Sequence, residues 1–159
     1  MTIYFTDGSA SPNPGPGGFA VIKNGKPWVI GGEPTASGVA RTNTTNIRME
    51  GFAIMAALLD ANGEDCEIKS DSEFWVNVLT KWAPNWAANN WQKKSKGEIQ
   101  NLDIVKPLFE IYQKSAAKLT WVRGHDGTEL NELADQWANK AREMKLTDQS
   151  MPFETTVDL

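Results

Sequence analysis

The sequence predicts a mixed α/β domain in which a five-stranded sheet begins with three antiparallel strands and is flanked by helices. Short β-rich runs separated by turn residues fill residues 3–32, and amphipathic helical stretches then alternate with two further strands. With 159 residues, 40% of them hydrophobic, the chain can bury about two thirds of its unfolded surface around one core. We expect one domain over residues 1–145 and an acidic, weakly patterned tail over 146–159.

The three antiparallel strands are predicted at residues 3–6, 19–23 and 28–32, which are rich in β-branched and aromatic side chains. Between the second and third stands Asn24-Gly25, a dipeptide typical of two-residue hairpin turns. The first strand is joined to the second by a segment rich in proline and glycine.

A helix is predicted next, because apolar residues recur at helical spacing. Residues 44–46 provide capping side chains for its start, and Asn62-Gly63 favours its end. Residues 66–70 form the fourth strand, and a second helical stretch covers 72–82, which we expect Pro84 to interrupt. The apolar stripe of the first helix consists of Met49, Phe52, Ala53, Ala56 and Leu59.

A third helix is predicted after Asn101, its possible cap, although Pro107 removes one of its backbone hydrogen bonds. The fifth strand is predicted at 118–122 and a long amphipathic helix at 130–144. Because helical crossovers join them, the first, fourth and fifth strands should run parallel. Residues that follow these strands then gather at one edge of the sheet, where active sites of such folds lie.

The net charge of −4 argues against a protein that coats nucleic acid by bulk attraction. Residues 74–97 nevertheless contain no Asp or Glu. Two interpretations remain open: a surface that binds nucleic acid, or core tryptophans beside solvated lysines, which fits Trp75 and Trp82 best. The charged and aromatic side chains concerned are Lys81, Lys93, Lys94, Lys96, Trp75, Trp82, Trp86 and Trp91.

We expect a monomeric cytoplasmic protein without membrane association. Cys66 has no second cysteine with which to form an internal disulfide. Because His125 is the only histidine, a zinc site built from Cys and His ligands is not expected either. No apolar run approaches the roughly 20 residues of a membrane span, and no export signal precedes the first strand.

Four acidic residues are candidates for a metal site. Asp7 and Asp71 directly follow predicted strands, and Glu50 and Asp135 lie at the borders of apolar helix stripes, near the helix starts. Two neighbouring carboxylates repel each other, so one should keep its proton unless a divalent cation is present. Oxygen ligands suit Mg²⁺ or Mn²⁺, and two such ions about 4 Å apart would support phosphodiester hydrolysis. Alternatively, each residue is a turn, cap or surface residue.

Five motifs carry a family resemblance. They are FTDGS around Asp7, NPGPGG from Asn13, TTNIRME ending at Glu50, SDSEF around Asp71, and WVRGH with NELAD over residues 121–135. In content, order and spacing they resemble the bacterial type 1 ribonucleases H over residues 3–142.

The resemblance implies the ribonuclease H fold and an endonuclease that hydrolyses the RNA strand of RNA/DNA hybrids, leaving 3'-hydroxyl and 5'-phosphate ends. It implies two Mg²⁺ ions in the presence of substrate, with Mn²⁺ as a possible substitute. Asp7, Glu50, Asp71 and Asp135 match the acidic metal ligands of the family. His125 matches a loop histidine thought to help water positioning or product release, a task that suits a group titrating near neutrality.

Substrate-binding residues follow from the same resemblance. Asn13 and Asn46 match positions that contact 2'-hydroxyls, and Thr45 and Asn101 match a phosphate pocket for the DNA strand. Residues 74–97 resemble the basic protrusion of the family, so that Trp82, Trp86, Trp91, Lys93 and Lys94 become candidates for contact with the hybrid.

The chain departs from the family at two places near the DNA strand. Asn43 stands where relatives have an arginine, with Arg41 two residues earlier. Residues 87–90, where relatives often carry lysines or arginines, contain none.

Three other functions compete with this reading. Resolvase-like or integrase-like nucleases share the fold, but they lack the combination of TTNIRME, WVRGH and a basic protrusion. A module that binds hybrids without cutting them would gain nothing from clustered carboxylates near phosphate. A small α/β domain with an unrelated ligand is excluded only by the coincidence of the motifs.

Overall fold

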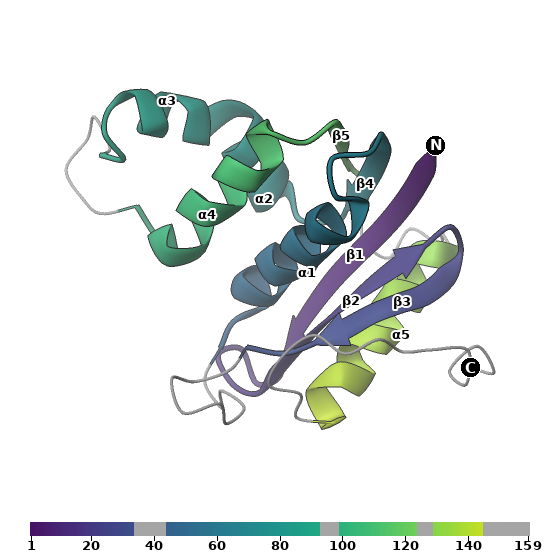
Figure 1. The fold of residues 1–159 in the computed structure, drawn as a ribbon. Coiled ribbons are helices and arrows are strands. Elements are labelled where there is room, and N and C mark those ends of the chain that lie inside the picture. Colours follow the sequence, from purple (N-terminus) through teal and green to yellow (C-terminus); the bar gives the residue numbers. More distant parts are fainter. Residues whose placement is uncertain (34–43, 93–98, 124–128, 145–159) are drawn as a thin grey trace.

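The computed structural model describes residues 1–33, 44–92, 99–123 and 129–144, and it consists of a sheet with helices on both faces (Figure 1). The strands are β1 (Thr2–Ala10), β2 (Gly17–Lys23), β3 (Lys26–Gly31), β4 (Cys66–Ser70) and β5 (Ala117–Trp121). The helices are α1 (Asn46–Ala61), α2 (Glu73–Asn77), α3 (Ala83–Ala88), α4 (Leu102–Gln113) and α5 (Glu129–Met144), with a π-helical turn, η1 (Val78–Trp82), between α2 and α3.

The sheet has the order β3-β2-β1-β4-β5. β1, β2 and β3 pair antiparallel, whereas β4 pairs parallel with both β1 and β5. The predicted fold class is therefore confirmed. In the hairpin between β2 and β3, Asn24 and Gly25 have φ angles of 48° and 86°, which are the positive values that a tight two-residue turn requires.

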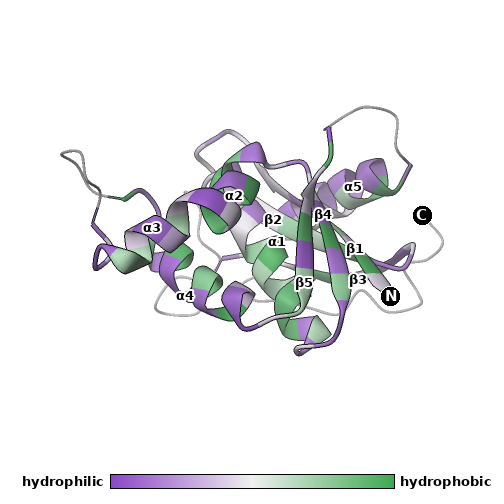
Figure 2. Cartoon of the chain, turned by 90° about the horizontal axis from the view of Figure 1, so that it is seen from above, coloured by the Kyte–Doolittle hydropathy of each residue, from purple (hydrophilic) through white to green (hydrophobic). Residues whose placement is uncertain are grey.

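Each face of the sheet has its own core. Alternate residues of β1 and β2 point to opposite faces, so Tyr4 and Val21 pack towards α1 and α4, while Phe5 and Ile22 pack towards α5. α1 is largely hydrophobic, as befits a helix held between the sheet and other helices, whereas α5 alternates hydrophobic and hydrophilic residues (Figure 2). The two cores fix α1 and α5 on opposite sides of β1.

Helix α1 starts and ends where its capping residues predict. The hydroxyl of Thr45 accepts a hydrogen bond from the Arg48 N–H, and Asn62, with φ 48°, ends the helix in the left-handed conformation. The predicted stripe is wrong at its last member, because Leu59 is 53% exposed whereas its neighbour Leu58 is buried.

The expected break at Pro84 is also wrong. The chain stays helical from α2 to α3, because the N–H of Ala83 bonds to the carbonyl of Val78 in a wide π turn. Pro84 then lies in the first turn of α3, where its missing N–H is tolerated. Helix α4 likewise continues through Pro107.

Residues 145–159, which include the predicted tail, lie outside the described part, so the proposed domain boundary stays a prediction. Within the described ranges, no helix has both the length and the apolar character needed to cross a membrane.

Candidate metal centre

The parallel register of β1 and β4 brings two acidic residues together. The last pair in this register is Thr6 with Ser70. Asp7, the next residue of β1, therefore lies beside Asp71, the first residue after β4. Asp7 does not follow its strand as expected. It lies inside β1, because β1 continues to pair with β2 as far as Ala10.

Gly8 allows α1 to approach β1 closely at this point. A Cβ atom on Gly8 would overlap the backbone nitrogen of Glu50 and the carbonyl carbon and side chain of Met49. The glycine of the FTDGS motif therefore lets the first turns of α1 rest on the strand beside Asp7. Glu50, half-buried next to the buried Met49, is carried to the two aspartates.

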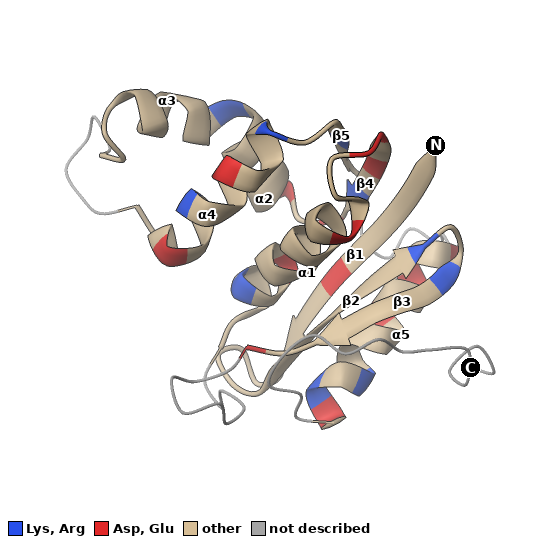
Figure 3. Cartoon of the chain, in the orientation of Figure 1, with Lys and Arg blue, Asp and Glu red and all other residues tan. Residues whose placement is uncertain are grey.

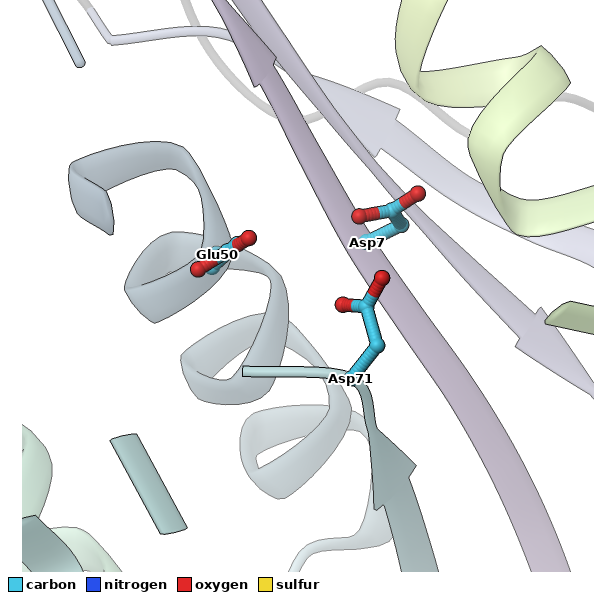
Figure 4. A group of neighbouring side chains, drawn as sticks. All are labelled: Asp7, Glu50 and Asp71. Atoms are coloured by element: carbon cyan, nitrogen blue, oxygen red, sulfur yellow. The ribbon is translucent and has the colours of Figure 1, made fainter. Parts of the chain in front are cut away.

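Asp7, Glu50 and Asp71 each place one carboxylate oxygen within 4.8 Å of the others. In Figure 4 the carboxyl groups of Asp7 and Asp71 face each other, with Glu50 on the neighbouring helix. Among the described residues, this is the group of three acidic side chains that meets this closely. The structure thus brings together three of the four predicted carboxylates.

Ser72 supports the cluster from the start of α2. Its side chain accepts from the Trp75 N–H at 3.2 Å, and it lies near enough to Glu50 to favour the ionised form of that carboxyl group. Trp75 is fully buried, and its indole N–H donates to the carbonyl of Ile47 in α1 at 2.6 Å. This bond joins α2 to the first turn of α1.

Burial and mutual repulsion raise the pKa values of two of the carboxyl groups. Burial, reinforced by the charges of Asp71, Asp135 and Glu50, raises the pKa of Asp7 to about 9, although the Gly8 N–H opposes this by donating to Asp7 Oδ1 at 2.8 Å. Burial likewise raises the pKa of Glu50 to about 7; the Ser72 hydroxyl opposes this and the charge of Asp71 adds to it. Such a site favours a divalent cation, which removes the repulsion.

Asp135, the fourth predicted ligand, is half-buried on α5, across the sheet from α1. It lies outside the 4.8 Å group. Its charge is nevertheless felt at Asp7, since it contributes to the raised pKa of that group. Asp135 therefore borders the cluster from the side of α5.

Comparison with known proteins agrees with this geometry. The sequence model of the family described as RNase H matches residues 1–143. The chain belongs to the RNase H family. "Ribonuclease H" of Syntrophomonas wolfei is 36% identical over 142 residues, which are 87% of this chain and 94% of that protein. "Ribonuclease HI" of Pseudomonas aeruginosa is 37% identical over 145 residues, 88% of this chain and 92% of the relative.

A solved structure shares the fold. LC9-RNase H1, described as a type 1 RNase H with the type 2 active-site motif, matches with a TM-score of 0.72 and 23% sequence identity. The match covers 99% of this chain and 83% of that one. The family match and the two relatives, together with this shared fold, confirm the resemblance to type 1 ribonucleases H. The acidic cluster is the part of this RNase H chain that fits the metal dependence of the family.

Two predicted contact residues for RNA lie together beside the cluster. The loop containing Asn13 is held against the start of α1 by two backbone hydrogen bonds between Gly15 and Thr44. The Asn46 N–H donates to Asn13 Oδ1 at 3.1 Å, and Asn46 Oδ1 accepts from the Ala10 N–H at 2.6 Å. Both amide oxygens are therefore engaged within the protein.

Thr45 and Asn101, the predicted phosphate-pocket residues, both contact Arg48. The Arg48 N–H donates to Thr45 Oγ1 at 3.1 Å, and the Arg48 guanidinium donates to Asn101 Oδ1 at 3.2 Å. Arg48 thus joins the start of α1 to the start of α4.

The four tryptophans of residues 74–97 are not buried and exposed as expected. Trp75 is buried as expected, but Trp82 is 42% exposed, and its inclusion in the core is wrong. The π turn that absorbs Pro84 places Trp82 at the surface, where it contacts Phe74 and Trp86 with ring centroids 6.4 and 6.2 Å apart. Trp86 and Trp91 are half-buried, and Trp91 packs edge-on against Phe109. Trp82 is therefore the most accessible of the four.

Several predicted residues lie outside the described ranges. His125, Lys93 and Lys94 are among them, as are Arg41 and Asn43.

Four residues that shape the site were not singled out from the sequence, although each lies in one of the quoted motifs. Gly8 belongs to FTDGS, Arg48 to TTNIRME and Ser72 to SDSEF. Trp121 opens WVRGH; it is 45% exposed and its indole N–H donates to the Asp71 carbonyl at 3.3 Å. Their place in these motifs is the sequence feature that could have identified them.

Proposed function

We propose that this chain is a metal-dependent ribonuclease H, which hydrolyses the RNA strand of RNA/DNA hybrids and leaves 3'-hydroxyl and 5'-phosphate ends. The observation that carries the proposal is the meeting of Asp7, Glu50 and Asp71 within 4.8 Å, in a chain that matches the RNase H family over residues 1–143. No nucleophilic side chain is needed, because water is the attacking group in such a reaction.

Mg²⁺ is the cofactor we propose, with Mn²⁺ as a possible substitute. Asp7, Glu50 and Asp71 supply oxygen ligands, and Asp135 would join them from α5. Two bound ions would supply activation of the attacking water and stabilisation of the leaving oxygen. The protein's own contribution is to hold buried carboxylates close together, with the Ser72 hydroxyl favouring the ionised form of Glu50.

Recognition of RNA is assigned to Asn13 and Asn46. Since an N–H donor occupies the oxygen of each amide, each NH₂ group is left to donate elsewhere. A ribose 2'-hydroxyl can accept such a bond, and it is accessible in the shallow minor groove of an A-like duplex. These two side chains would let the enzyme distinguish RNA from DNA.

Contact with the DNA strand is assigned to a phosphate pocket at Thr45 and Asn101 and to the aromatic surface around Trp82. Trp86, Trp91, Lys93 and Lys94 are further candidates on the same segment. His125 is proposed to assist water positioning or product release. We further propose that the protein acts as a monomer in the cytoplasm.

One cleavage assay tests the proposal. The protein is incubated with labelled RNA/DNA hybrid, RNA duplex or DNA duplex, in Mg²⁺ or in EDTA. We expect cleavage of the RNA in the hybrid alone, lost in EDTA and reduced by at least about 10³-fold in Asp71→Asn, since that variant loses a metal ligand. Binding without cleavage would indicate a binding module, and equal cleavage of DNA would indicate another nuclease of this fold.

A further inference from the structure

Arg48 uses all its side-chain donors inside the protein. Nε donates to Glu33 at 3.1 and 3.2 Å, Nη2 to Glu33 at 2.6 Å and to Asp103 at 2.8 Å, and Nη1 to Asp103 at 3.1 Å and to Asn101 at 3.2 Å. A guanidinium has five N–H groups, and these partners account for every one of them. Arg48 therefore has no donor left for a substrate phosphate.

The charge of Arg48 is also balanced. Two carboxylates, Glu33 and Asp103, face it, and the Glu33 side chain is only 6% exposed. Glu33 is fixed further by the Thr44 hydroxyl, which donates to it at 2.7 Å. In Figure 3 a basic residue (blue) lies at the start of α1 and an acidic residue (red) at the start of α4. Arg48 therefore has a structural role here and does not bind an anion.

The contact with Arg48 determines which way the amide of Asn101 is turned. A guanidinium can only donate, so the atom of Asn101 that faces it must be the oxygen. The NH₂ group then points away from Arg48. Asn101 does not use its side chain to cap α4, although it immediately precedes that helix with φ 57°. Its two amide hydrogens are thus left for a ligand.

Thr45 is oriented by the same residue. Its hydroxyl oxygen accepts from the Arg48 N–H, which leaves the hydroxyl hydrogen to donate elsewhere. Two neutral donors, at the starts of α1 and α4, are therefore set by the backbone and side chain of one arginine. Neutral donors bind a phosphate well only when they are held in place, because they lack the long-range attraction of a charge.

We propose that Arg48 is a positioning residue for substrate: it turns the NH₂ of Asn101 outward, so that Asn101 and Thr45 bind one phosphate of the DNA strand. This inference rests on the proposed assignment of these two residues to a phosphate pocket.

The first test is Arg48→Lys, which keeps the charge beside Glu33 but has too few donors and the wrong shape to hold Asn101 as well. We expect KM for the hybrid to rise about tenfold with kcat unchanged within about twofold, since only substrate binding is impaired. Asp60→Asn is the matched control. It breaks a polar network at the other end of α1, so it should lower stability and leave KM unchanged.

A double variant separates positioning from mere stabilisation. If Arg48 acts through Asn101, Arg48→Lys should raise KM little further in an Asn101→Ala background. Effects that multiply, or a fall in kcat with KM unchanged, would overturn the proposal while leaving the phosphate pocket in place. An unchanged KM in Asn101→Ala would instead remove the pocket itself, and cleavage of hybrid would still report the proposed enzyme activity.

Asn101→Asp provides a test that does not depend on whether Arg48→Lys folds. The new carboxylate still accepts from Arg48, so thermal stability should not fall. It replaces the outward donors by an acceptor that repels phosphate, so KM should rise at least as much as in Asn101→Ala. A wild-type KM in Asn101→Asp would show that the NH₂ group does not face the substrate, and the proposal would fail.

Discussion

The charge state of Asp7 governs the acidic cluster. With a pKa raised to about 9 by burial and by neighbouring acids, Asp7 holds its proton at neutral pH when no cation is bound. Glu50, with a pKa raised to about 7 by burial and the nearby Asp71, is then partly protonated. A cation that binds there must displace these protons, so metal binding should strengthen as pH rises.

The raised pKa of Asp7 predicts how metal-free stability depends on pH. Between its ordinary value of 3.8 and its folded value of about 9, the native state binds more protons than the unfolded state, so stability falls as pH rises through this window. In EDTA, we expect the Tm of the wild type to fall between pH 5 and 9. Asp7→Asn, which cannot ionise, should lose much of that dependence and be more stable than the wild type at pH 8, by about 3 °C or more.

Calorimetry at several pH values, with chelator present throughout, makes the comparison. Parallel curves for the two proteins would mean that Asp7 is not held protonated by its surroundings.

At the scale of elements, the approach of α1 to β1 matters most for the site. At Gly8 there is no room for a Cβ atom, because the backbone of Glu50 lies too close to the strand. Helix and strand approach each other closely beside Asp7, so a change in their spacing moves Glu50, a proposed metal ligand. Interiors are too closely packed to absorb an added methyl group at such a point.

Gly8→Ala should therefore impair catalysis and stability together. The methyl group pushes the start of α1 away from β1 and separates Glu50 from the two aspartates, and we expect kcat/KM to fall by at least about tenfold, or about 1.4 kcal/mol. Gly25→Ala is the control. Its positive φ of 86° makes alanine destabilising by about 1–2 kcal/mol, but the hairpin is remote from the cluster. Equal losses of kcat/KM in the two variants would indicate general destabilisation instead.

The sequence predicts elements well where the signal is local. β4 was predicted with its observed bounds, 66–70, and the ends of α1 follow from Thr45 and Asn62. The length of β1 could not be predicted, because its continuation past Asp7 depends on pairing with β2, a long-range contact. Trp82 was misplaced because the π turn before Pro84 rotates the helix in a way that a regular period does not predict.

The site was predictable in part for the same reason. Asp7 and Asp71 follow from parallel pairing and Glu50 from its stripe, since each depends on one regular element. The hydrogen bonds of Trp75 with Ile47 and of Arg48 with Asn101 join different elements. Their partners are set by packing, which a single sequence does not specify.

At the scale of the whole molecule, a polar network at the end of α1 holds the helix to the antiparallel strands. Asp60 accepts from the hydroxyl of Tyr4 at 2.6 Å and from the indole of Trp28 at 2.9 Å, and pairs with Lys23 at 3.0 Å. Burial opposes its ionisation, but these hydrogen bonds outweigh burial and lower the pKa of Asp60. This network stabilises the fold away from the acidic cluster.

Asp60→Asn should thus separate stability from catalysis. We expect the free energy of unfolding to fall by about 1–3 kcal/mol, because charge-assisted hydrogen bonds are weakened or lost, while kcat and KM for the hybrid stay within about twofold of wild type. Urea denaturation and steady-state cleavage measure the two quantities. A large loss of kcat in a folded variant would mean that the two ends of α1 are coupled.

The lowered pKa of Asp60 sets the sign of its own pH dependence. Its contribution to stability is present above the ordinary pKa of 3.8 and is lost as pH falls through the lower folded value. Asp60 therefore changes the stability of the protein at acid pH, whereas Asp7 changes it between pH 3.8 and about 9.

The parallel alignment of Thr6 with Ser70 also bears on the order of events as the chain folds. Asp7, Glu50 and Asp71 come from segments far apart in sequence, and parallel pairing closes a long loop, which is slow compared with the formation of local turns and helices. The acidic cluster cannot exist before β4 has paired with β1 and α1 has packed against the sheet. In a refolding experiment, the first appearance of Mn²⁺ affinity would time this docking step, and stabilisation by the cation would act on unfolding rather than on the early stages of folding.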